Sequence, residues 1–218
     1  MAEATRTADA LRLHRLQQDI GDLGGESVFE RLRRWRRVRS PTLSMAQVAH
    51  DPAWAEAFAR EARRLTDALA PWPVACHHFG SSAIPGMASK PILDIALAVA
   101  EPPARPAVAA HLPALDYTDW GESPIAAGTV WYWRIAADAP VCALHLCDAG
   151  APWLASALNF RDYLRAHPGR GEDYTRTKQA LAADCGEDIA AYTLRKTALM
   201  YRLIAEADAW RARADAPA

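Results

Sequence analysis

Between residues 51 and 70, apolar residues recur at the spacing of one helix face. Trp54, Phe58, Leu65 and Leu69 lie on that stripe, and the prolines at 71 and 73 cannot continue a helix. A shorter pattern of the same kind predicts a helix over 106–115. After residue 152 the pattern is helical almost throughout, and helices are expected over 153–167, 172–183 and 188–210.

Four short runs rich in aliphatic and aromatic residues predict β-strands instead. These runs are 74–79, 92–100, 129–136 and 141–147. Only a few residues separate the last two runs, so we expect them to pair as an antiparallel hairpin. The order of elements predicts an α+β fold, in which helices cover a mixed β-sheet.

The chain divides by pattern into four parts. We expect an N-terminal helical extension over 1–45, an α/β core over 46–150, a C-terminal helical unit over 151–210 and a tail over 211–218. The extension contains a helix on which six arginines crowd between Arg31 and Arg39. Two interpretations stay open for it, a solvated helix face or a contact with nucleic acid.

Composition narrows the class of protein. Hydrophobic residues make up 51% of the 218 residues, which excludes a disordered chain, and no window is apolar enough to span a membrane. Lys and Arg number 25 against 26 Asp and Glu, so the net charge of −1 requires neither nucleic acid nor an anionic membrane as a partner. The four cysteines are too scattered for a disulfide framework, and we expect a cytoplasmic protein.

Candidate chemistry begins where the first predicted strand ends. Gly80, Ser81 and Ser82 form a turn of small residues that can bring backbone N–H groups and hydroxyls close to a phosphate. Asp94 lies inside the second predicted strand, on the face that alternation otherwise gives to small residues such as Ala96. A carboxylate in such a place needs a partner, and a structural ion pair with Lys90 or an arginine is the alternative to a functional role.

The segment HHFGSSAIPGMASKPILDIALAV resembles the hallmark of the GrpB-like family, which belongs to the nucleotidyltransferase superfamily. The similarity continues through Leu144-His145-Leu146, NFRDYLRAHP and two later Tyr-x-x-x-Lys motifs, and it covers about residues 46–205. The resemblance implies a polymerase-β-type core, in which the glycine–serine turn holds a triphosphate. It also implies that Asp94 is catalytic and holds Mg²⁺, with His145 as a second catalytic residue on the neighbouring strand.

The sequence departs from that pattern at two positions. Ala96 stands where the superfamily carries its second metal-binding carboxylate, and Ala143 stands where the family often has a further histidine. A symmetric two-metal clamp has therefore lost a ligand. Mg²⁺ held by Asp94 together with substrate phosphates stays an expectation.

Further ligand-binding residues are expected from cations and hydroxyls along the C-terminal half. Tyr174 with Lys178, and Tyr192 with Lys196, each place a phenol and an ammonium one helical turn apart. Each pair could bind an anion, or the tyrosine could pack in the core while the lysine is solvated. The expected ligand-binding set is completed by four other cations, Lys90, Arg134, Arg161 and Arg165.

Two functions compete on these observations. The first is a nucleotidyltransferase-like enzyme that acts on a small-molecule acceptor with a phosphate-containing co-substrate such as an NTP. The second is a protein that binds a nucleotide or another anion without turnover, or an enzyme that works without metal on a small metabolite, and Ala96 favours it. A nucleic-acid module built on the Arg31–Arg39 helix is a weaker third.

Overall fold

The computed structural model describes residues 47–123, 128–136, 140–185 and 189–216, and only the backbone is described for 189–194, 197 and 198. The predicted extension over 1–45 and its arginine-rich helix lie outside these residues.

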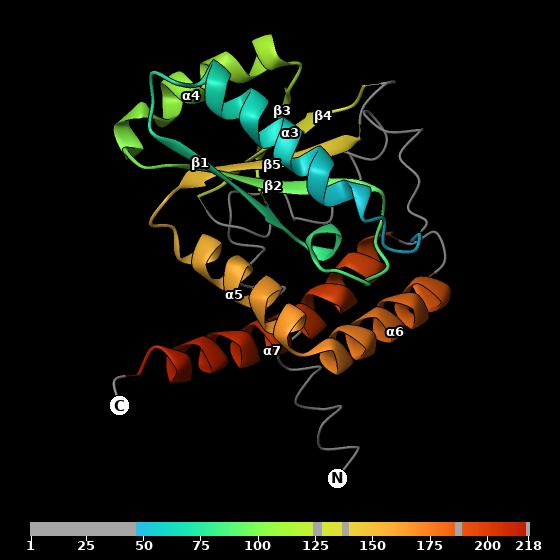
Figure 1. Cartoon of the computed structure of the whole chain (residues 1–218). Coiled ribbons are helices and arrows are strands. Elements are labelled where there is room, and N and C mark those ends of the chain that lie inside the picture. The colour runs from blue at the N-terminus through green and yellow to red at the C-terminus, as the bar shows by residue number, and fades with distance from the viewer. Residues whose placement is uncertain (1–46, 124–127, 137–139, 186–188, 217–218) are drawn as a thin grey trace.

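A five-stranded mixed sheet forms the centre of the protein, and the expected α+β class is confirmed (Figure 1). The strands are β1 (Val74–Phe79), β2 (Ile92–Val99), β3 (Thr118–Glu122), β4 (Val130–Arg134) and β5 (Val141–Asp148). They lie in the order β1-β2-β5-β4-β3, where β2 and β5 are parallel and the other neighbours are antiparallel. The four strands expected from sequence are all present, and β4 and β5 form the predicted hairpin.

The strand β3 was not expected from the sequence. Its segment, TDWGE, has no apolar alternation, and all of its residues except Trp120 are exposed. It lies at the edge of the sheet and its register shifts between Asp119 and Gly121. A short, bulged and polar strand is a common edge strand, and it carries little pattern because neither of its faces is deeply buried.

Helices flank the sheet. They are α3 (Ala53–Ala68), α4 (Arg105–His111), α5 (Pro152–Ala166), α6 (Pro168–Cys185) and α7 (Ile189–Ala214), with short 3₁₀ turns η1 (Ser81–Ala83), η2 (Pro102–Ala104) and η3 (Leu112–Leu115). The helix α6 begins at Pro168, earlier than predicted, because proline at the first helical position loses no hydrogen bond. The helix α7 continues past residue 210, where the predicted helical unit ended.

The two faces of the sheet pack against different helices. The side chains of Ile95 and Leu97 join Leu65 of α3, and Leu69 just after that helix, in the larger core. On the other face, Ala96 and Ala98 meet Leu154 of α5 in a smaller cluster. Figure 1 shows α3 and α4 over one face and α5, α6 and α7 beyond the other. The predicted alternation along 92–100 is thus confirmed, and it places Asp94 toward the C-terminal helices.

Candidate functional site

The turn after β1 brings the backbone against Asp94. Phe79 pairs with Asp94 across β1 and β2, so Gly80 follows directly beside the carboxylate. Gly80 has φ +70°, and a Cβ at this position would overlap an oxygen of the Asp94 carboxylate. Glycine is required here both for the backbone angle and for the close approach. The turn therefore sets the hydroxyl of Ser81 at the edge of the Asp94 face.

Lys178 of α6 reaches this turn from the C-terminal helices. Its Nζ donates to Ser81 Oγ at 3.0 Å and to the backbone carbonyl of Ala88 at 3.2 Å. The ammonium also lies 4.7 Å from the ring centroid of Tyr174, one helical turn earlier. The side chain is buried. Residues almost a hundred positions apart in the chain thus form one polar contact.

Lys90 and Lys196, together with Lys178, act electrostatically on one carboxylate, that of Asp94. Burial raises the pKa of Asp94 to about 6, and attraction to Lys90, Lys196 and Lys178 opposes that rise. We call this group of four side chains the lysine cluster. It draws on the loop before β2, on β2 itself, and on α6 and α7.

The lysines of the cluster are less basic than lysines in water. Burial, together with repulsion from Lys196 and Lys90, lowers the pKa of Lys178 to about 7. Burial and the charge of Lys90 lower the pKa of Lys196 to about 8. Burial also lowers the pKa of Lys90. At neutral pH the cluster still carries more positive than negative charge, and its protonation responds to whatever binds.

These three residues are the only lysines in the 218-residue sequence, although the chain has 25 Lys and Arg residues together. Every other cation is arginine, which stays charged when it is buried. Lysine is a compact point charge whose pKa shifts readily, so these three positions can release protons that arginine would keep. Counting lysines apart from arginines would have drawn attention to the three positions together.

The residues present do not fit a magnesium ion. In the described part of the chain, no three His, Cys, Asp or Glu side chains come together in a way that could hold a metal. The three ammonium groups that attract the Asp94 carboxylate would also repel a divalent cation. The expected Mg²⁺ therefore has no supporting set of donors among the described residues.

His145 lies on the Asp94 face of the sheet but inside a box of aromatic rings. It pairs with Ala96 on one side and Trp131 on the other. The rings of Phe79, Trp131 and Trp153 have centroids 5.0 to 5.3 Å from its own. Burial lowers the pKa of His145 to about 3, so the imidazole is neutral at physiological pH, and its Nδ1 has no hydrogen-bond partner among the described residues.

Two expected ligand-binding residues turn away from Asp94. The hydroxyl of Ser82 lies 3.2 Å from Nε2 of His78, whose ring stacks on Phe58 of α3. Arg134 lies on the α3 face of β4 and pairs with Glu61 at 3.4 Å. The structure does not bring these two expected ligand-binding residues to Asp94, because the adjacent serines diverge in the 3₁₀ turn and Arg134 pairs with the buried carboxylate of Glu61.

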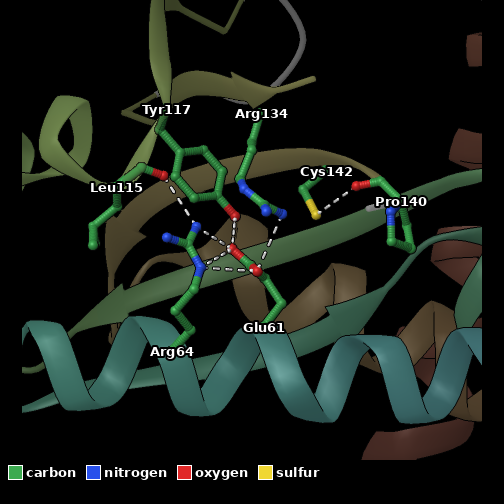
Figure 2. Close-up of polar contacts among 7 residues, drawn as sticks. All are labelled: Glu61, Arg64, Leu115, Tyr117, Arg134, Pro140 and Cys142. Carbon is green, nitrogen blue, oxygen red and sulfur yellow. Dashed lines mark hydrogen bonds and ion pairs between the residues drawn. The ribbon is translucent and has the colours of Figure 1, made fainter. Parts of the chain in front are cut away.

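Figure 2 shows the cluster that holds Arg134. Arg64 donates to the Glu61 carboxylate with Nε and Nη2, and Tyr117 donates to it at 2.8 Å. Glu61 is buried, as is Tyr117. We call this group of four residues, Glu61, Arg64, Tyr117 and Arg134, the glutamate cluster. Sequence reasoning missed Glu61 because it lies within an ordinary helical charge pattern.

Arg161 and Arg165 of α5 bind the backbone around the turn. Arg161 Nη1 donates to the carbonyl of His78 at 2.9 Å, and Arg165 donates twice to the carbonyl of Ala83, at 3.0 and 2.7 Å. The two carbonyls flank residues 80–82, so the arginines position the turn. Tyr174 packs within the core of the C-terminal helices, and the side chain of Tyr192 lies outside the described residues.

The fold and the site together define an α+β protein with a glycine–serine turn, a carboxylate on the adjoining strand and lysines supplied by C-terminal helices. A family model described as GrpB protein matches residues 45–206. The chain belongs to this family. The superfamily placement expected from sequence, among nucleotidyltransferases, is consistent with it.

Similar proteins agree with this assignment. The crystal structure of conserved protein GrpB from Enterococcus faecalis superposes with a TM-score of 0.65 at 26% identity, covering 74% of this chain and 96% of that one. The UPF0157 protein YqkA of Bacillus subtilis is 34% identical over 152 residues, which span 70% of this chain and 44% of that protein.

A Mycobacterium tuberculosis protein named dephospho-CoA kinase is 31% identical over 172 residues, which span 68% of this chain and 42% of that protein. This chain thus matches less than half the length of both curated relatives. None of the described helices is long and apolar enough to cross a membrane.

Proposed function

We propose that this GrpB-family protein binds a small molecule through a phosphate group, at the lysine cluster and the hydroxyl of Ser81. The observation that carries the proposal is the convergence of the three lysines of the chain on one carboxylate. Three ammonium groups and one carboxylate leave a surplus of positive charge in a partly dehydrated place, and an anion removes that cost.

The donors suit a phosphate group in particular. Ammonium and hydroxyl groups form strong charge-assisted hydrogen bonds to phosphate oxygens, and a glycine turn lets such a ligand approach the backbone. Lys178 already points its Nζ at Ser81 Oγ, so one phosphate oxygen could accept from both groups after a small shift. These donors specify only the phosphate group of the ligand. For the remainder of the ligand, the superfamily placement favours a nucleotide.

Nucleotidyl transfer is the second candidate function. The glycine–serine turn beside a strand carboxylate favours it, since this is the arrangement that the resemblance led us to expect. The named dephospho-CoA kinase is a protein of phosphate chemistry, but most of its length lies outside the match with this chain. The donor set at Asp94 argues for anion binding as the more general function.

Thermal unfolding with and without pyrophosphate tests the proposal. A ligand that binds only the folded state raises the melting temperature, so pyrophosphate and ATP should both raise it, each with EDTA present. Lys178→Met should remove most of the rise. Arg176→Met is the matched control, because Arg176 is an exposed cation on the same helix and its substitution should leave the rise intact.

The outcome also separates the two candidates. A rise that needs no divalent ion supports anion binding. Consumption of ATP that requires Mg²⁺, followed as released pyrophosphate, would favour nucleotidyl transfer. No response to either compound in the wild-type protein would overturn the proposed function.

A further inference from the structure

The contact between Ser81 and Lys178 has the geometry of a nucleophile and its base. We propose that Ser81 Oγ is a nucleophile for phosphoryl groups and that Lys178 Nζ is the general base that takes its proton. The two atoms lie 3.0 Å apart, within the reach that proton transfer requires. Serine–lysine pairs are a known variant of activated nucleophiles.

The surroundings of Lys178 orient its nitrogen for this role. The carbonyl of Ala88 accepts one N–H at 3.2 Å, and the Tyr174 ring lies on another side of the nitrogen at 4.7 Å. When Nζ is neutral, donation to Ala88 leaves its lone pair for the hydroxyl hydrogen of Ser81. The side chain is 4% exposed, so water does not compete strongly for that lone pair.

Charged groups from each neighbouring element act on this nitrogen. Lys90 before β2 and Lys196 on α7 repel a proton from it, while Asp94 on β2 attracts one. With burial added, the pKa of Lys178 falls to about 7, so the neutral amine is well populated near physiological pH. A lysine beside other cations is a known way to obtain a neutral amine at such pH.

Ser82 offers a comparison within the same turn. Its hydroxyl is buried at 1% exposure and contacts His78 Nε2 at 3.2 Å. The pKa of His78 is lowered to about 4 by burial and by Arg165 and Arg161, so this imidazole is neutral, yet the pair is enclosed against α3. Ser81 is only half-buried, so an electrophile can approach it.

The step balances with a phosphoric ester or anhydride as the phosphoryl donor. Ser81 Oγ attacks phosphorus and forms an O–P bond, while the bond from phosphorus to the leaving oxygen breaks and that oxygen keeps the electron pair. The proton of Ser81 moves to Lys178 Nζ and from there to the leaving oxygen. Lys90 and Lys196 stabilise the negative charge that develops on the phosphoryl oxygens.

A fluorophosphonate probe tests the pair directly. Attack by Ser81 forms an O–P bond and expels fluoride, and Lys178 accepts the proton. We expect one adduct per chain by intact mass, located to Ser81 by peptide mapping, and a labelling rate that rises with pH around a midpoint near 7. Ser81→Ala and Lys178→Arg should abolish labelling, because arginine keeps the charge but cannot act as a base.

Ser156→Ala is the control, because Ser156 lies on α5 and bonds Asp208, away from the turn. The inference rests on the proposed anion site, so pyrophosphate stabilisation is measured on the same samples. Stabilisation of Lys178→Arg without labelling supports the pair. If the wild-type protein is stabilised but never labelled, or is labelled at another serine, the pair is overturned and the anion site stands. If it is labelled at Ser81 but pyrophosphate does not stabilise it, the pair stands and the anion site fails.

Discussion

Two polar clusters, each centred on one carboxylate, lie on opposite faces of the same sheet, and they are built differently. In the glutamate cluster, one carboxylate receives hydrogen bonds from Arg64 and Tyr117 and an ion pair from Arg134. In the lysine cluster, one carboxylate is surrounded by three lysines, and a lysine donates to a neutral hydroxyl. The first cluster pairs its carboxylate with arginines and a phenol, and the second pairs its carboxylate with lysines.

The two carboxylates respond in opposite directions. Burial alone would raise the pKa of Glu61, but hydrogen bonds from Arg64 and Tyr117 hold it below its usual value. Burial raises the pKa of Asp94 to about 6, and three lysines do not fully offset it. Arginine keeps its proton when buried, whereas lysine loses it readily. The difference indicates that the glutamate cluster stabilises the fold and that the lysine cluster can change its protonation.

The largest expected effect on stability is at Glu61. Glu61→Gln leaves two arginines beside a neutral side chain, and neither can lose its proton. We expect a loss of about 3–5 kcal/mol in the free energy of unfolding, measured by urea denaturation. Glu56→Gln is the control, because its pair with Arg60 is exposed and contributes about 0–1 kcal/mol. A loss at Glu61 no larger than that of the control would contradict the structural role.

A smaller loss is expected for Asp94→Asn, because lysines can release protons. Burial raises the pKa of Asp94 to about 6, so ionisation of Asp94 lowers the stability of the folded protein as the pH rises through that value, and Asp94→Asn removes this cost. We expect a loss of about 1–3 kcal/mol at about pH 5, a smaller loss at about pH 7 and pH 9, and recovery in pyrophosphate. A loss of equal size at all three values, unaffected by pyrophosphate, would mean that the two clusters do not differ.

The wild-type protein should itself gain stability between about pH 7 and pH 8.5. The pKa values of Lys178 and Lys196 are lowered in the folded state, so the unfolded chain binds more protons in this range and stability rises with pH. Above the ordinary thiol pKa of 9.0, the raised pKa values of Cys76 and Cys142 oppose this trend.

Unfolding free energies measured across this range check the slope. The double substitution of Lys178 and Lys196 by Met should flatten it, and so should saturating pyrophosphate, which favours the charged lysines. A slope that survives the double substitution would have to come from other groups.

The smallest expected effect on stability and binding is at Arg165. This residue donates two hydrogen bonds to the carbonyl of Ala83 and is not a member of either cluster. Arg165→Met should loosen the turn, cost about 1 kcal/mol of stability and weaken pyrophosphate binding by less than about tenfold. Isothermal titration of this variant beside Lys178→Met gives the comparison. Binding weakened as much as in Lys178→Met would place Arg165 in direct contact with the anion.

Local patterns predicted most of the fold and part of the site. Alternation along 92–100 predicted that Asp94 and Ile95 lie on opposite faces of the sheet, because successive side chains of a strand point to opposite faces. The divergence of Ser81 from Ser82 depends on a 3₁₀ turn that no spacing rule gives. The partner of Arg134 lies 73 residues away on α3, and the lysines come from separate elements, so both groupings depend on tertiary packing.

The most direct test of the anion site is an NMR titration of the lysine side chains, labelled with ¹³C at the ε carbon. Only three lysine signals are expected, because the sequence has three lysines. We predict that two of them titrate with pKa values near 7 and 8, well below 10.5, and that pyrophosphate moves both values upward. Three lysines that all titrate near 10.5 and ignore pyrophosphate would contradict the anion site.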